Sequence, residues 1–205
     1  MFSVPPAATP GSRSAGLLGA TGVLLTGLLA FQLSLPPVAP TVAPATAGGD
    51  GPCTLRPPGY LRGRFFGAVN LTANWSGKNL LCDGMPKPGG EGVRLFFAGE
   101  QPGGGRLSVL IAIDGRPDGL AGAERPANVT VIDERAGRFF GTSGKGRCWT
   151  SIGSVTALAR SRDYPAGHRI EGMLYCLGAL PSLGDRASLT LGDLHFAGRI
   201  SADED

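Results

Sequence analysis

A long uncharged run near the start of the chain constrains what the rest of it can fold into. Residues 15–35 contain no Asp, Glu, Lys, Arg or His, and most of them are apolar. A helix rises ~1.5 Å per residue, so this run just spans the ~30 Å hydrocarbon core of a bilayer. We expect these residues to enter a membrane as a helix, which leaves the globular fold to the residues after it.

The charges on either side of this run predict its orientation. Arg13 and the terminal amine precede it, and the first charge after it is Asp50. Positive charge stays on the cytoplasmic side of a membrane, so the carboxyl-terminal part is expected outside the cytoplasm, in the periplasm or the extracellular space. We therefore expect a single-pass protein of the cell membrane.

A cleaved secretory signal is the alternative to a membrane anchor. Residues 45–47 (Ala-Thr-Ala) have the small side chains that signal peptidase requires, and cleavage after Ala47 would release a secreted protein. The apolar run is longer than the roughly 7–15 residues usual in such signals, which favours the uncleaved anchor. Both alternatives export the domain.

Composition divides the chain into five parts. The linker after the apolar run is rich in Pro and Ala, and such a sequence forms an extended, semi-rigid spacer. The residues after the linker are enough for one domain with a substantial core. The expected parts are a short cytoplasmic amino terminus (1–14), the transmembrane helix or signal (15–35), the linker (36–52), the exported domain (53–200) and an acidic tail (201–205).

Short runs of alternating apolar and polar residues recur in the exported domain, and helical periodicity is absent. Residues 92–98 and 107–113 alternate on either side of a Gly-rich turn, and residues 128–133 and 138–142 indicate a second hairpin. The last run, 187–200, changes phase at Gly192-Asp193, which is where we expect a β-bulge.

These runs, with further strands near 60–71 and 78–83, amount to about nine strands and no helix. Many short strands separated by regular turns are typical of an antiparallel β-sandwich. The predicted fold class is therefore all-β, an antiparallel sandwich for which a jelly-roll-like topology is one form. It is preceded by the single amino-terminal helix.

Four cysteines, an even number, indicate two disulfides in an exported domain. No two of them are spaced closely enough for a usual zinc site. Cys148 and Cys176 are symmetric about Arg162, in the loop of a predicted hairpin, so antiparallel pairing places them opposite each other. We therefore predict the disulfides Cys148–Cys176 and Cys53–Cys82, the second of which pins the entry segment to the sheet.

The charge balance excludes nucleic acid as a partner. Of the 19 Lys and Arg residues only Arg13 precedes the apolar run, so 18 basic residues stand against 16 acidic ones in the rest of the chain. Nucleic-acid-binding domains instead carry clustered basic residues and a strongly positive net charge.

The sequence contains no catalytic signature. It has two histidines and no Gly-x-Ser-x-Gly motif, so a serine hydrolase is not indicated. A secreted glycan-acting hydrolase of the jelly-roll type stays open as an alternative, because paired carboxylates can carry that reaction without histidine. It would draw on Asp163, His168 and Glu171, whereas His195 is expected on the outer surface.

The loop residues Asp114, Asp118 and Glu124 are candidate ligands of a Ca²⁺ site. They match no EF-hand pattern, but Ca²⁺ is held by carboxylate oxygens and tolerates irregular geometry. Otherwise these residues are solvated loop acids. No other cofactor is expected.

Aromatic residues give the best indication of a binding surface. Gly-Arg-Phe-Phe-Gly occurs at 63–67 and again at 137–141, and adjacent strand residues point to opposite faces. One Phe of each pair is thus expected outside, where it can contact a glycan or a protein. Tyr60, Tyr164 and Trp75, the last in a predicted turn, belong to the same set.

These observations favour an exported, membrane-tethered binding or interaction module of the cell envelope over an enzyme. Its expected partners, besides the membrane, are an envelope glycan or another envelope protein.

Overall fold

The structure is a computed structural model and describes residue 53 and residues 55–89, 91–144, 146–162 and 164–202. The predicted anchor or signal, the linker up to residue 52 and the tail from residue 203 lie outside these residues, so the predictions about them stay predictions. Within the described ranges, no helix has both the length and the apolar character needed to cross a membrane.

Antiparallel strands form nearly all of the regular structure, which confirms the all-β prediction. The described residues hold twelve strands, rather than about nine, and two short 3-10 helices, η1 (Gly77–Asn79) and η2 (Pro117–Gly119). The strands are β1 (Tyr60–Gly67), β2 (Leu71–Ser76), β3 (Leu81–Pro86), β4 (Gly92–Glu100), β5 (Arg106–Asp114), β6 (Glu124–Asp133), β7 (Arg138–Gly141), β8 (Cys148–Leu158), β9 (Gly167–Cys176), β10 (Leu180–Pro181), β11 (Ser188–Leu191) and β12 (Leu194–Ser201).

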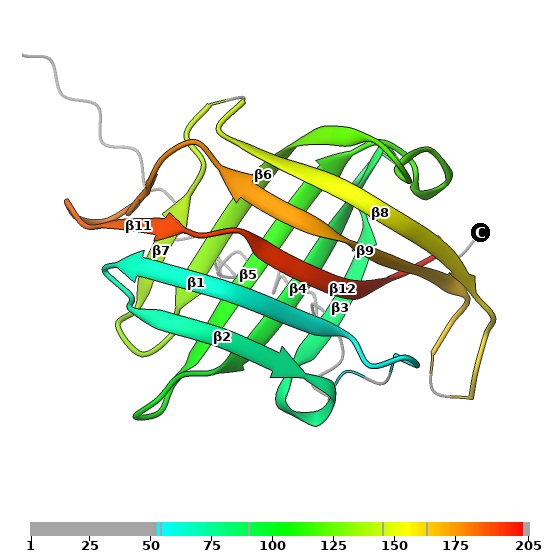
Figure 1. Cartoon of the computed structure of the whole chain (residues 1–205), viewed down its shortest axis with the longest axis horizontal. Coiled ribbons are helices and arrows are strands. Elements are labelled where there is room, and N and C mark those ends of the chain that lie inside the picture. Colours follow the sequence, from blue (N-terminus) through cyan, green and yellow to red (C-terminus); the bar gives the residue numbers. More distant parts are fainter. Residues whose placement is uncertain (1–52, 54, 90, 145, 163, 203–205) are drawn as a thin grey trace, which may run out of the picture. The chain divides into compact units, whose positions relative to one another are not determined.

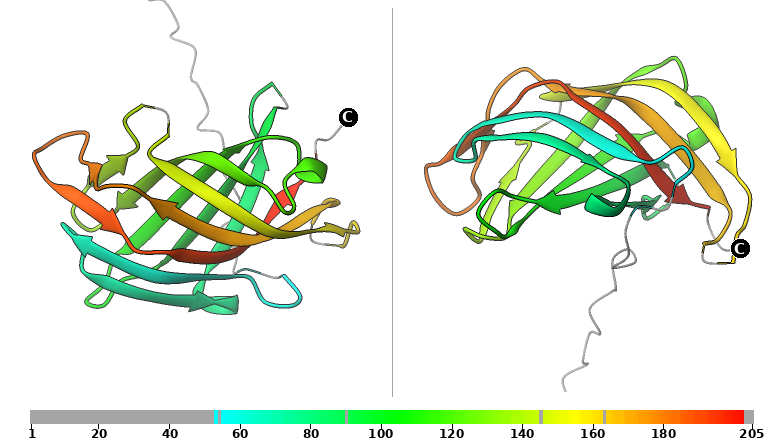
Figure 2. Two further views of the ribbon diagram at one scale, coloured as in Figure 1. Left: turned by 45° about the horizontal axis from the view of Figure 1, so that its top comes forward. Right: turned by 60° about the horizontal axis from the view of Figure 1, so that its bottom comes forward.

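All twelve strands belong to one hydrogen-bonded sheet that curls over itself into two layers (Figure 1). The strand order is β10-β11-β1-β12-β9-β8-β6-β5-β4-β3, with β2 paired to β1 and β7 paired to β6. Figure 2 shows the layer of β1, β2, β9 and β12 crossing that of β4 and β5. Two facing layers fit the predicted sandwich, but they are continuous, so neither a division into two sheets nor a jelly roll is confirmed.

The predicted hairpins pair as the alternation indicated. Phe97 faces Val109 between β4 and β5, and Ile132 faces Phe139 between β6 and β7. The predicted strand near 60–71 is instead a hairpin, because the backbone N–H of Gly67 donates to the Asn70 side chain (3.3 Å) and turns the chain between β1 and β2.

The predicted bulge at Gly192-Asp193 is present and lies between β11 and β12. Residues 192–194 stand opposite only residues 63 and 64 of β1, and one extra residue on one strand is a β-bulge. Both strands pair with β1, and the Gly192 N–H donates to the carbonyl of Arg64 (2.8 Å) between them. The phase change in the sequence therefore marks the point where the pairing of β11 with β1 ends and the pairing of β12 with β1 begins.

Inward-facing side chains of both layers fill one core. Adjacent phenylalanines divide between its inside and its outside, as predicted. Phe65 is 1% exposed and Phe66 37%, whereas in the second motif Phe139 is 47% exposed and Phe140 0%. Each Gly-Arg-Phe-Phe-Gly motif thus contributes one ring to the core and one to the surface.

Both predicted disulfides are present. Cys148 faces Cys176 across β8 and β9, and the register shifts only after Ile152. Cys53 bonds to Cys82 of β3, and its backbone N–H also donates to the Leu80 carbonyl (2.7 Å). The segment from residue 53 to β1, here called the entry segment, is therefore fixed to the sheet before the first strand begins.

Candidate binding site

Four alternating residues of β1 form a stripe on the outer surface. Leu61 and Phe65 point into the core, so Tyr60, Arg62, Arg64 and Phe66 point outward. The guanidinium carbon of Arg62 lies 4.7 Å from the ring centroid of Tyr60, and that of Arg64 lies 4.8 Å from the centroid of Phe66. We call these four residues the β1 stripe; each arginine is held flat against a ring by a cation–π contact.

Polar residues of the neighbouring strands flank the stripe. Arg62 is paired with the exposed His195 of β12 on one side and with the exposed Asn74 of β2 on the other. Thr72 of β2 faces Arg64 in the same way. The outer surface around the stripe thus offers hydrogen-bond donors and acceptors rather than an apolar patch.

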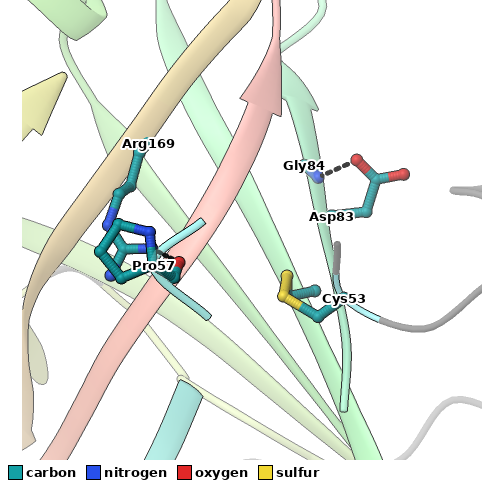
Figure 3. The surroundings of a disulfide bond; sticks show 6 residues. Cys53, Pro57, Asp83, Gly84 and Arg169 are labelled. Atoms are coloured by element: carbon teal, nitrogen blue, oxygen red, sulfur yellow. Dashed lines mark hydrogen bonds between the residues drawn. A yellow bond between two sulfur atoms is a disulfide. The ribbon is translucent and has the colours of Figure 1, made fainter. Parts of the chain in front are cut away.

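A hydrogen-bond network fixes the Tyr60 end of the stripe. The Tyr60 hydroxyl donates to Oε1 of Glu171 on β9 (2.7 Å), and Arg169 donates to the other carboxylate oxygen (3.2 Å). The buried Arg169 also donates to the carbonyl of Pro57 in the entry segment (2.7 Å), a contact that Figure 3 shows.

This network favours the charged form of Glu171 and the neutral form of Tyr60. The hydrogen bond from Tyr60, with help from Arg169, holds the pKa of Glu171 below its usual value. Burial and the neighbouring carboxylate raise the pKa of Tyr60. A general acid needs a carboxyl group with a raised pKa, so Glu171 is suited to positioning Tyr60 and not to protonating a leaving group.

The pKa of Glu171 gives a test of this network. Because its folded-state pKa is lowered, Glu171 stabilises the fold above the ordinary value of 4.5, and this contribution is lost as the pH falls through the folded-state pKa. The difference in melting temperature between the wild type and Glu171→Gln should therefore be largest near neutral pH and shrink in acid. Melting curves across the acid range measure it, and a difference that does not change with pH would contradict the network.

A cavity of about 710 Å³ lies next to this end of the stripe. One wall is the entry segment and the other is the connection from β8 to β9, while Arg199 of β12 also lines it. We call it the entry cavity. Its lining includes Leu55, Arg56, Pro58, Ser161, Tyr164 and Arg199.

Arg199 is the least expected residue of the cavity, because it is charged and only 7% exposed. Its guanidinium carbon lies 4.7 Å from the ring centroid of Tyr164, and Nη2 donates to the carbonyl of Pro165. Nε has no hydrogen-bond partner among the described residues. Burial lowers the pKa of Arg199, and the negative charge of Asp83 acts in the opposite direction.

Of the three predicted aromatic residues, the structure brings two to this site. Tyr60 belongs to the stripe, and Tyr164 lines the cavity. Trp75 lies in β2 rather than in a turn, and its side chain is buried, with its ring centroid 6.5 Å from that of Phe65. Trp75 is therefore a core residue, which corrects the expectation of an exposed ring.

The three acids of the candidate calcium site have separate partners. Asp114 pairs with Lys87, and Glu124 accepts a hydrogen bond from the Tyr175 hydroxyl. Asp118 lies 3.6 Å from Nε2 of His168. No group of three or more metal-binding side chains occurs in the part of the chain that the structure describes. The calcium prediction gains no support from this arrangement.

The residues of the hydrolase alternative do not converge either. His168 and Glu171 are three positions apart on β9, which places their side chains on opposite faces of the strand. His168 contacts Asp118, whereas Glu171 contacts Tyr60. Asp163 lies outside the described residues.

Sequence reasoning missed Arg169 and Arg199, which connect the stripe to the cavity. The alternation of β12, with Phe196 and Ile200 buried, could have placed Arg199 on the outer face. Nothing local indicates that the entry segment and the β8–β9 connection lie against it, because these are distant in sequence.

Comparisons with protein-family models, with characterised proteins and with solved structures found no match for this chain.

Proposed function

We propose that this chain is a non-enzymatic binding module of the cell envelope, whose ligand is an acidic envelope glycan lying along the β1 stripe. Residues 15–35 export the module and tether it to the membrane in this proposal. Two disulfides support an oxidising compartment, since such bonds persist outside the cytosol.

The β1 stripe is the observation that carries the proposal. Arg62 and Arg64 are exposed, and each rests on an aromatic ring of the same strand. An arginine held in this way loses less side-chain entropy when it binds, and its planar N–H groups match the oxygens of a carboxylate or a phosphate. Alternate residues of a strand are ~7 Å apart, so the stripe presents two fixed cations in a row.

The surroundings favour a glycan over an apolar partner. The exposed ring of Phe66 lies at one end of the stripe and the Tyr60 ring at the other, and aromatic rings pack against the apolar faces of sugars. Asn74, Thr72 and His195 beside them can bond to hydroxyl groups.

Binding to a polyuronic acid tests the proposal. The full chain in detergent should bind immobilised polygalacturonate and not neutral dextran, with affinity that falls as salt is added. Arg62→Gln with Arg64→Gln should weaken this binding by about tenfold or more, since a hydrogen bond to a charged group contributes ~1.5–3 kcal/mol.

The matched control changes two exposed arginines elsewhere, Arg94 and Arg116, to Gln, which removes the same net charge. This control variant should keep most of the affinity. Equal losses in both double variants would show a diffuse charge effect and contradict the stripe. If the wild type fails to bind the acidic polymer even at low salt, the glycan proposal is wrong and crosslinking to envelope proteins is the next experiment.

A further inference from the structure

The entry cavity combines fixed walls with two arginines. Of its described lining residues, Arg56 and Arg199 are basic and none is acidic. Leu55, Pro58 and Leu158 are among the others, so apolar side chains lie beside the two arginines. A volume of about 710 Å³ lies within the range of small-ligand sites, which are typically apolar pockets with a few polar groups that orient the ligand.

The walls of the cavity are held in place without a ligand. The disulfide Cys53–Cys82 and the hydrogen bond from Arg169 to Pro57 hold the entry segment, as Figure 3 shows around Cys53. On the other side, the Ser161 N–H donates to the Tyr164 carbonyl (2.9 Å), and the Tyr164 N–H donates to the Ser161 hydroxyl oxygen (3.2 Å). Because both walls are braced, little ordering is needed when a ligand binds.

The charge of Arg199 gives the cavity its chemistry. A buried cation is costly unless hydrogen-bonded groups and opposite charge surround it. Asp83 contributes negative charge but is not among the residues that line the cavity. The Tyr164 ring lies against the guanidinium of Arg199, and the Pro165 carbonyl accepts a hydrogen bond from its Nη2. The Ser161 hydroxyl lines the same cavity; it accepts from the Tyr164 N–H and still has its own proton to donate.

We propose that the entry cavity is an oxyanion pocket, in which Arg199 and Arg56 bind one carboxylate or phosphate group of a small ligand or of a terminal sugar unit. The exposed Arg56 approaches the anion from the entry segment, and the Ser161 hydroxyl can donate a further hydrogen bond. The cavity lies at the Tyr60 end of the β1 stripe, because its lining residue Pro58 comes two positions before Tyr60. The inference rests on the proposed function in one respect: it takes this anion to be the end of the acidic glycan that lies along the β1 stripe.

Small anions test the pocket directly. Glucuronate or inorganic phosphate, or both, should raise the melting temperature of the full chain in detergent, whereas glucose should not, because a ligand of the folded state stabilises it by mass action. Calorimetry then compares the affinities of the two anions. The tighter one identifies the group that the pocket prefers as a carboxylate or a phosphate. If neither anion exceeds glucose, the proposal is overturned.

Two variants locate the binding in this cavity. Arg56→Gln changes an exposed residue and should weaken anion binding by about tenfold, while Arg116→Gln in another loop should not. Arg199→Lys keeps the charge but loses the planar donor set, so it should bind more weakly than the wild type. Wild-type affinity in both Arg56→Gln and Arg199→Lys would overturn the proposal.

The stripe variant separates this proposal from the proposed function. Arg62→Gln with Arg64→Gln should lose the polymer and keep glucuronate or phosphate at wild-type affinity. Polymer binding through the stripe without any small-anion binding would refute the oxyanion pocket and leave the glycan proposal standing. Small-anion binding through Arg56 without any polymer binding would support the cavity and refute the glycan ligand.

Discussion

Phe140→Ala is expected to lower the free energy of unfolding by about 3–5 kcal/mol, because it removes a fully buried ring and leaves a cavity in the core. The neighbouring change Phe139→Ala should cost no more than ~1 kcal/mol, since about half of that ring is already exposed to water. Denaturant unfolding of the two variants, monitored by circular dichroism, measures the difference.

The first Gly-Arg-Phe-Phe-Gly motif supplies an independent repeat of this comparison with the order of the rings reversed. Phe65→Ala should be the costly change there, and Phe66→Ala the mild one. Equal costs within both pairs would show that the motifs do not divide their rings between core and surface. Phe66→Ala should in addition weaken glycan binding, which Phe139→Ala should leave unchanged.

Gly59→Ala is expected to dislodge the entry segment. A Cβ atom at this position would lie 2.3 Å from Sγ of Cys53, 2.9 Å from Sγ of Cys82 and 2.8 Å from the carbonyl oxygen of Ala197. Backbone and disulfide atoms surround the site, so the clash cannot be relieved by rotating a flexible side chain. We expect a loss of ~2–4 kcal/mol, the range for a lost disulfide, with free thiols in the purified protein and no anion binding in the entry cavity.

Gly119→Ala is the matched control, because nothing lies within 4 Å of the Cβ that it would add. This variant should keep the wild-type stability and have no reactive thiol. Thiol titration under denaturing conditions, without reductant, distinguishes the two variants. A Gly59→Ala protein with both disulfides intact and wild-type stability would show that the entry segment does not pack against Cys82 as described.

The sequence by itself determined the features that depend on neighbouring residues. Alternation in residues 92–98 and 107–113 predicted a hairpin, and the turn between them set its register. The same local symmetry placed Cys148 opposite Cys176, which also determined the second disulfide by elimination. These predictions hold because a hairpin is closed by a short loop, so its pairing can be read from positions along the chain.

Short elements and tight turns are harder to predict from the sequence. The turn at Gly67–Asn70 is made by the Asn70 side chain, which accepts from the Gly67 N–H and donates to the Gly67 carbonyl. The sequence pattern continues as a strand through this turn and so predicts a turn at Trp75, where the structure has the strand β2. A two-residue strand such as β10 carries no periodicity at all, which explains part of the difference between about nine strands and twelve.

Only the tertiary structure decided the candidate site. The hydrogen bond from Tyr60 to Glu171 joins residues 111 positions apart, and the one from Arg169 to Pro57 joins residues 112 positions apart. Both depend on β12 lying between β1 and β9, an order that follows from how the whole sheet curls to bury its core. The hydrophobic effect that buries the core is non-directional, so it leaves no local pattern that shows which distant segments will meet. The position of Arg199 in the entry cavity therefore has no signal in the sequence.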